Sequence, residues 1–173
     1  MNHPPLGALV DPFRCWARLT PRKAAIVDRV RGTRATYRDI DDAAQHWMTL
    51  LAGRGVKRGD RVALLSMNRI EVVGLFYGCV RLGAALVPLN WRLAEPELVR
   101  VVADARVALL VGEARFSAVG HAVAKSPWLD LDEAMTALAG ASPAPRLSSG
   151  SEEIDAESAA LILYTSGSTG KPK

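Results

Sequence analysis

The chain has 173 residues, of which 49% are apolar and 23% are charged. This ordinary globular composition excludes disorder for most of the chain, and the length corresponds to one domain with a sizeable core. Its 22 Lys and Arg against 18 Asp and Glu give a net charge of +4, too mild an excess to indicate nucleic-acid binding. Two cysteines, Cys15 and Cys79, are too few for a disulfide framework or a structural zinc site.

The sequence contains no export or membrane signal. Prolines and charged residues interrupt the N-terminus, which therefore does not resemble a signal peptide. The longest apolar stretch, 72–80, is stopped by Arg81, and its continuation over 82–89 is broken by glycines and Pro88. A membrane-spanning helix needs about 20 apolar residues. We therefore expect a soluble, cytoplasmic protein.

The first elements expected are a short helix and a short strand. Asp11 followed by Pro12 is typical of a helix N-cap with proline in the first turn, which predicts a helix over 12–19. A strand is expected over 24–28, and Gly32 indicates a turn over 30–33.

A long amphipathic helix is predicted over 37–51. Thr36 and Asp39 resemble a capping box at its start, and Gly53 and Gly55 end it. Apolar residues recur at helical spacing on one side. The other side is predicted to be polar, with Asp39, Asp41, Asp42, Gln45 and His46.

Strands and helices then alternate along the chain. We expect a turn at 57–60, a strand at 61–66, a buried helix at 70–82, a strand at 84–89, a helix at 95–105 and a strand at 107–111. Pro88 is expected to place its strand near a sheet edge. The remainder is predicted as a weaker helix at 115–125, a helical turn at 132–139, a surface loop at 140–157 and an apolar strand at 159–164.

This alternation predicts an α/β fold with a mostly parallel sheet flanked by helices. The apolar runs within 61–66 and 159–164 agree, because both faces of a parallel sheet are covered. Outside the predicted core, Arg58, Arg61 and Arg69 are expected to form a solvated rim, and no pattern of histidines indicates a metal site or a catalytic triad.

The residues with the clearest chemistry are the last ten. A buried strand is predicted to run into the sequence Tyr164-Thr165-Ser166-Gly167-Ser168-Thr169-Gly170-Lys171-Pro172-Lys173. Glycines let backbone N–H groups converge on an anion, hydroxyls donate to phosphate or bind a divalent metal, and lysines add positive charge. The residues alone allow two interpretations, a phosphate-binding loop or a flexible polar tail.

Two common nucleotide motifs do not fit this loop. The Walker pattern has four residues between its glycines and a Ser or Thr after its Lys, whereas two residues separate Gly167 and Gly170, and Lys171 precedes Pro172. No G-x-G-x-x-G sequence follows a predicted strand, so a dinucleotide fingerprint is also excluded.

The ten residues match the phosphate-loop signature of the AMP-forming adenylating enzymes, the family of acyl-CoA synthetases, peptide-synthetase adenylation domains and beetle luciferases. Segments 36–40, 56–68 and 81–93 also resemble this family, so the resemblance covers nearly the whole chain. The ending Asn90-Trp91-Arg92-Leu93 looks more like fatty or aryl acyl-CoA synthetases than amino-acid-activating domains. On this feature a fatty acid is favoured as the substrate.

The resemblance implies an AMP-forming acid–CoA ligase. In that family a carboxylate attacks the α-phosphate of ATP to give an acyl adenylate, and the thiol of coenzyme A then displaces AMP. It assigns contacts with the ATP phosphates to Thr165, Ser166, Gly167, Ser168, Thr169, Gly170, Lys171 and Lys173, and a contact with Mg²⁺ to Thr165. It places no catalytic residue within this chain.

The resemblance further implies that residues 1–173 are an incomplete N-terminal AMP-binding domain that ends inside the loop 164–173 and lacks the C-terminal domain. Such a chain is expected to be inactive alone. Two alternatives stay open: a truncated, non-catalytic paralogue that acts as an interaction module, and an unrelated phosphate-binding α/β protein.

Overall fold

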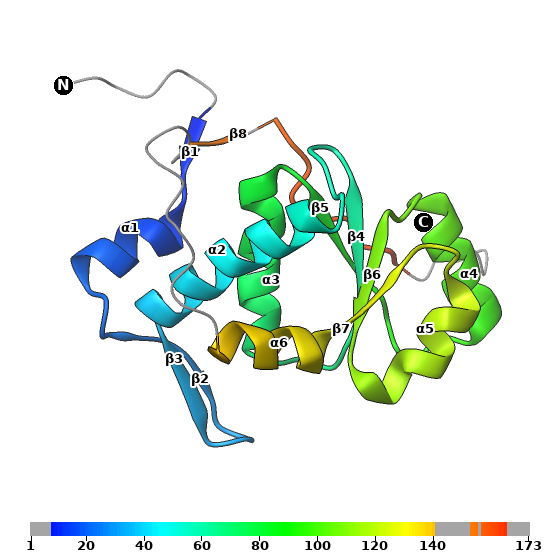
Figure 1. The fold of residues 1–173 in the computed structure, drawn as a ribbon, viewed down its shortest axis with the longest axis horizontal. Coiled ribbons are helices and arrows are strands. Elements are labelled where there is room, and N and C mark those ends of the chain that lie inside the picture. The colour runs from blue at the N-terminus through cyan, green and yellow to red at the C-terminus, as the bar shows by residue number, and fades with distance from the viewer. Residues whose placement is uncertain (1–7, 141–152, 156, 166–173) are drawn as a thin grey trace.

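The computed structural model describes residues 8–140, 153–155 and 157–165. Its centre is a four-stranded sheet in the order β5–β4–β6–β7, in which every neighbouring pair is parallel (Figure 1). These strands are β4 (Arg61–Leu65), β5 (Ala85–Pro88), β6 (Leu109–Gly112) and β7 (Trp128–Asp130). The predicted α/β fold is confirmed.

Helices cover both faces of this sheet. Side chains of α2 (Tyr37–Gly53), α3 (Glu71–Leu82) and α6 (Leu131–Gly140) pack on one face, around Trp47 and Leu75. Side chains of α4 (Glu95–Asp104) and α5 (Ser117–Val123), which follows the short 3₁₀ helix η1 (Ala114–Phe116), pack on the other. Strand β4 serves both faces: Val62 and Leu64 lie in the first cluster, Ala63 and Leu65 in the second. This explains why residues 62–65 of the strand are all apolar.

Two small antiparallel pairs lie beside this core. Strand β1 (Ala8–Val10) pairs with β8 (Glu153–Asp155), and β2 (Ala24–Asp28) pairs with β3 (Thr33–Thr36) to form a hairpin that projects from the body (Figure 1). Helix α1 (Pro12–Leu19) precedes the hairpin.

The predicted helix starts are confirmed in atomic detail. The Asp11 carboxylate accepts the N–H groups of Phe13 and Arg14 at 3.0 and 3.1 Å, which caps α1. Thr36 and Asp39 form the reciprocal capping box of α2, with bonds of 2.8 and 3.2 Å. These local signals are reliable because the orphan N–H groups of a first turn must find acceptors nearby.

The predicted polar side of α2 is wrong at two positions. Asp41 and Gln45 are each only 5% exposed. Arg14 of α1 donates to the Gln45 side-chain oxygen at 2.9 Å, and Arg81 of α3 pairs with Asp41 at 2.6 Å. Because α1 and α3 bring their own charges to this side of α2, polar residues there are buried as partners and not as a solvated face.

Other elements differ from the predictions in extent. Strands β3 and β7 were not predicted, because they are only four and three residues long and lack a periodic pattern. The helical turn expected at 132–139 is the complete helix α6. Much of the predicted loop at 140–157 lies outside the described residues, and β8 is found within it.

The predicted buried strand at 159–164 is wrong. This segment makes a single parallel bridge, Leu86 to Leu161, and Leu161 and Leu163 are 42% and 64% exposed. Leu86 donates to the Ala160 carbonyl at 3.0 Å and accepts from Ile162 at 2.9 Å. The next donor on β5 would be residue 88, and a proline has no N–H, so the ladder stops after one step.

Candidate phosphate-binding site at the carboxyl edge of the sheet

The parallel strands end at one edge, where their loops bring polar groups together. Strand β4 is followed by Ser66, Met67 and Asn68, strand β5 by Leu89 and Asn90, and strand β6 by Glu113. In open α/β sheets ligands bind outside the carboxyl ends of the strands, because the loops there are free to present side chains and backbone amides. The fold therefore marks this edge as the candidate site.

A buried carboxylate fixes two of these loops to one another. Glu113 is 5% exposed, and its Oε1 accepts hydrogen bonds from the Ser66 hydroxyl at 2.8 Å and the Met67 amide at 2.7 Å. Arg115 lies 3.2 Å from the second oxygen. With three partners the hydrogen-bonding capacity of the Glu113 carboxylate is used within the protein, so this residue holds the two loops in place. Sequence reasoning missed it; the only signal is a Glu directly after an apolar strand.

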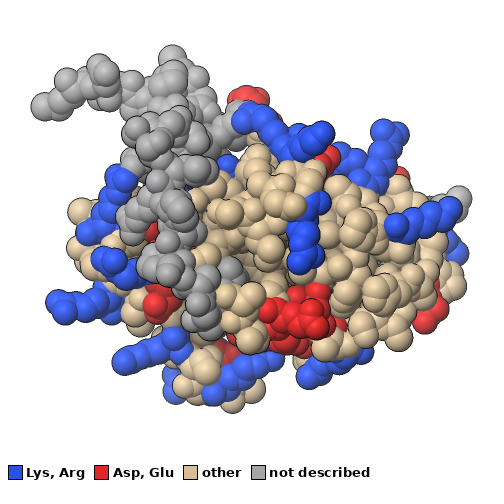
Figure 2. All heavy atoms as spheres, in the orientation of Figure 1, with Lys and Arg blue, Asp and Glu red and all other residues tan. Residues whose placement is uncertain are grey.

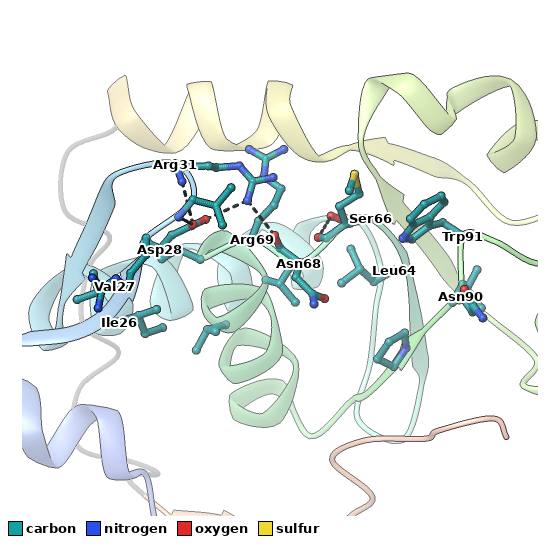
Figure 3. A pocket seen from close by; sticks show the side chains of 18 of the residues that line it. Ile26, Val27, Asp28, Arg31, Leu64, Ser66, Asn68, Arg69, Asn90 and Trp91 are labelled. Carbon is teal, nitrogen blue, oxygen red and sulfur yellow. Dashed lines mark hydrogen bonds and ion pairs between the residues drawn. The ribbon is translucent and has the colours of Figure 1, made fainter.

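An open cleft of ≈ 1080 Å³ extends from this edge to the β2–β3 hairpin (Figure 3). It is lined by residues 26–31 of the hairpin, 66–70 after β4 and 88–92 at the end of β5, together with side chains of α3. Figure 3 shows Asn68 between the two ends, Asp28 and Arg31 on the hairpin side, and Asn90 and Trp91 on the sheet side. The cleft thus joins the carboxyl edge to a segment far away in sequence.

Several of the arginines that border the cleft are held by partners. Arg31 pairs with Asp28 at 2.9 Å and donates to the Asn68 carbonyl at 3.0 Å. Arg92 lies over the Trp91 ring, with its guanidinium carbon 4.3 Å from the ring centroid. At that distance the cation is attracted to the ring face, so Trp91 is held as a platform beside the edge.

The predicted solvated rim of arginines is wrong for Arg69 and Arg61. Arg69 forks between Glu71, at 3.2 Å, and Asp132, at 2.6 Å. Burial opposes the charged form of Arg69, but these hydrogen bonds outweigh it and raise the pKa of the guanidinium. Arg61 donates to the carbonyls of residues 59, 105 and 106. Both arginines therefore make intramolecular contacts that hold separate segments of the chain together.

The predicted phosphate loop enters from the segment beside β5. At its single bridge this segment runs parallel to β5, in the direction of the carboxyl edge, and Thr165, four residues beyond the bridge, is exposed. Tyr164 is anchored just before it, since its hydroxyl donates to Asp104 of α4 at 2.5 Å. Partial burial and the neighbouring carboxylate raise the pKa of Tyr164 to about 12. The other predicted site residues lie outside the described residues: Ser166, Gly167, Ser168, Thr169, Gly170, Lys171 and Lys173.

The described residues offer Mg²⁺ one candidate ligand here. None of their His, Cys, Asp and Glu side chains form a group of three or more that could hold a metal ion. A single hydroxyl at Thr165 suits Mg²⁺, which keeps several waters and is usually shared between one or two protein oxygens and substrate phosphates. The donor set is therefore compatible with a metal that arrives with a nucleotide.

The fold and this edge define an α/β protein with a candidate ligand site outside the carboxyl ends of a parallel sheet. The AMP-binding enzyme family matches residues 13–173, and the chain belongs to this family. That membership rules out the alternative of an unrelated phosphate-binding protein.

Known proteins of this kind are similar over most of the chain. It is 34% identical over 166 residues to the long-chain-fatty-acid–CoA ligase FadD13 of Mycobacterium tuberculosis, covering 91% of this chain and 32% of that protein. It is 37% identical over 167 residues to the 2-succinylbenzoate–CoA ligase of Geobacillus kaustophilus, covering 91% and 30%. A solved Mycobacterium tuberculosis fatty acyl CoA synthetase superposes with a TM-score of 0.76 at 32% identity, over 93% of this chain and 32% of that one.

The chain therefore spans about a third of the length of the curated relatives it matches. Within the described part of the chain, no helix combines the length and the apolar character needed to cross a bilayer.

Proposed function

We propose that this chain is the first part of the N-terminal domain of an AMP-forming acid–CoA ligase. The ligase activates a carboxylic acid with ATP and then transfers the acyl group to coenzyme A. The observation that carries the proposal is the signature at 164–173, which follows a segment directed toward the carboxyl edge of the parallel sheet. Family membership over 13–173 supports it.

In this proposal the loop binds the phosphates of ATP. The backbone and hydroxyl groups of 165–170 donate to phosphate oxygens, and Lys171 and Lys173 compensate their charge. Thr165 contributes an oxygen to Mg²⁺, which when bound neutralises the phosphates and the leaving pyrophosphate. The Tyr164–Asp104 hydrogen bond fixes the start of the loop, so that its donors need less ordering when the nucleotide binds.

The proposed acid is a fatty acid. The sequence Asn90-Trp91-Arg92-Leu93 supports an acyl-CoA synthetase of the fatty or aryl type, and the relative from Mycobacterium tuberculosis is named for long-chain fatty acids. The relative from Geobacillus kaustophilus is named for 2-succinylbenzoate. A panel of fatty and aryl acids in the ATP–pyrophosphate exchange assay distinguishes these substrates.

The phosphate role is tested by separating the two half-reactions in the ligase that carries this segment. We expect Thr165→Ala and Lys173→Ala to slow ATP–pyrophosphate exchange about 10- to 100-fold, because a hydrogen bond to a charged group contributes about 1.5–3 kcal/mol. Thioester formation from supplied acyl adenylate should change much less, since the pyrophosphate has already left. Lys125→Ala, an exposed lysine after α5, is the matched control and should change neither step.

An equal loss in both half-reactions would contradict the phosphate role. Sequencing the coding DNA beyond codon 173 tests the domain proposal separately, because a ligase should continue in frame with the rest of its adenylating domain. An interaction module that ends at codon 173 would overturn it.

A further inference from the structure

The positive charge of this chain is concentrated in one short segment. Residues 18–38 contain seven of the 22 Lys and Arg but one of the 18 Asp and Glu, which leaves the remainder with 15 basic and 17 acidic residues. The whole positive excess therefore lies in this segment. All seven cations are exposed: Arg18, Arg22, Lys23, Arg29, Arg31, Arg34 and Arg38.

Exposed apolar side chains occur in the same place. Among the described residues seven large hydrophobic side chains are exposed, and four of them are in α1 and the β2–β3 hairpin: Trp16 at 45%, Leu19 at 66%, Val27 at 61% and Val30 at 95%. These four residues and the seven cations are called the hairpin patch. Single exposed hydrophobic residues are common, but a cluster among cations indicates a surface that meets something anionic and apolar.

The hairpin extends beyond the body of the molecule (Figure 1), and its residues 26–31 also border one end of the open cleft. Figure 1 shows β2 and β3 projecting beyond the helices, and Figure 2 shows blue spheres along the lower left of the same view, where Figure 1 places α1 and the hairpin. Val27 lies opposite Arg34 in the strand register, so an apolar and a basic side chain share one face. The patch continues onto α1, because Tyr37 and Trp16 approach to 5.9 Å between ring centroids.

The turn of the hairpin holds its tip in place. The Asp28 carboxylate accepts the N–H groups of Val30 and Arg31, each at 3.0 Å, and pairs with the Arg31 guanidinium at 2.9 Å. Gly32 completes the turn with φ +67°, a conformation that glycine adopts without strain. Thus the only acidic group of the segment is used inside the turn, while Val30 stays at the exposed tip.

We propose that the hairpin patch is a docking surface for anionic lipid bilayers. The cations attract the negative headgroups, and the exposed valines and α1 side chains enter the boundary between headgroups and acyl chains. A soluble polyanion such as a nucleic acid would use the cations but would gain nothing from Val30. The combination of charge and exposed apolar side chains therefore favours a lipid surface.

The proposal is tested by co-sedimentation of the purified chain with vesicles. Vesicles of phosphatidylcholine alone are compared with vesicles of equimolar phosphatidylcholine and phosphatidylserine. The chain should bind the anionic vesicles and not the neutral ones, and salt should weaken binding because it screens the headgroups. Replacing two exposed cations with R29Q/R34Q should lower the partition coefficient about 30-fold, at roughly fivefold for each basic residue near the surface.

Two matched variants distinguish binding through the patch from a response to net charge and from binding of any polyanion. R100Q/K125Q removes the same charge from exposed positions on α4 and after α5, across the molecule from the hairpin, and should bind like the unchanged chain. Val30→Ser removes only an apolar tip and should weaken binding to anionic vesicles while leaving binding to heparin unchanged. Near-ultraviolet circular dichroism confirms that each variant keeps the tertiary structure, since all substituted side chains are exposed.

Three results would overturn the proposal. Failure of the chain to bind anionic vesicles refutes it directly. An equal loss with R100Q/K125Q shows a response to net charge and not to the patch. Unchanged vesicle binding by Val30→Ser shows a surface for soluble polyanions instead of a bilayer.

Discussion

Removing the Arg81 guanidinium should destabilise this chain more than any surface substitution, because it joins three helices through buried charges. Arg81 lies in the last turn of α3. Its Nε donates to the Asp11 carboxylate at 2.6 Å, and its two terminal nitrogens donate to the side chain and the carbonyl of Asp41 at 2.6 and 2.9 Å. The three side chains are 5%, 3% and 7% exposed.

The magnitude follows from what Arg81→Met leaves behind. Two carboxylates would stay buried without their shared cation, and breaking a buried ion pair in this way costs about 3–5 kcal/mol. Asp11 also caps α1, so the position of α1 against α3 would be disturbed as well. For a urea dependence of about 2 kcal/mol per molar, the unfolding midpoint should fall by about 2 M.

Urea unfolding followed by tryptophan fluorescence measures this effect. The matched control is Arg100→Met, which removes the exposed Arg100 from α4 and should change the free energy of unfolding by less than about 0.5 kcal/mol. Arg81→Lys keeps the charge but loses the planar set of donors of the guanidinium. Its loss of unfolding free energy should therefore lie between those of Arg81→Met and Arg100→Met. A loss below about 1 kcal/mol for Arg81→Met, or one equal to that of the control, would refute the reasoning.

Three further outcomes are expected. Gly78→Ala should lower the free energy of unfolding by about 1–3 kcal/mol, because a Cβ there would lie 2.4 Å from an atom of α2. Gly53→Ala is the control, since its Cβ meets open space and the change should be neutral or stabilising. Parallel urea titrations compare the two variants. Burial raises the pKa of the Cys79 thiol to about 12, so at pH 8 iodoacetamide should label exposed Cys15 and reach Cys79 only on unfolding, and rapid labelling of both would contradict this. Burial would raise the pKa of Glu71, but the hydrogen bonds from the Arg69 guanidinium outweigh it and hold that pKa below 4.5. The stability that Glu71 contributes is therefore present above pH 4.5 and is lost as the pH falls through the folded pKa. Glu71→Gln should make the free energy of unfolding fall less steeply at acid pH.

The sequence was sufficient to propose a phosphate loop and insufficient to predict its surroundings. The string from Tyr164 to Lys173 is recognisable because each residue type acts locally, through a hydroxyl, a flexible glycine or a cation. The hydrogen bond from the Ser66 hydroxyl to Glu113 joins residues 47 positions apart in the sequence. No local pattern encodes that distance, because the two residues meet only after β4 and β6 have paired.

Much of the fold was also determined locally. The sequence predicted several features that depend only on neighbours a few residues away. These are the helix starts at Asp11 and Thr36, the end of α3 at Gly83 and the apolar strand β4. Alternation of such elements was enough for a parallel α/β sheet.

The tertiary structure decided which polar side chains are buried and where strand pairing stops. Asp41 and Gln45 resemble surface residues of an amphipathic helix until α1 and α3 supply Arg14 and Arg81. Segment 159–164 resembles a core strand until it meets a partner whose proline has no N–H to donate. In both cases the partner is distant in sequence, and burial or pairing depends on what that partner offers.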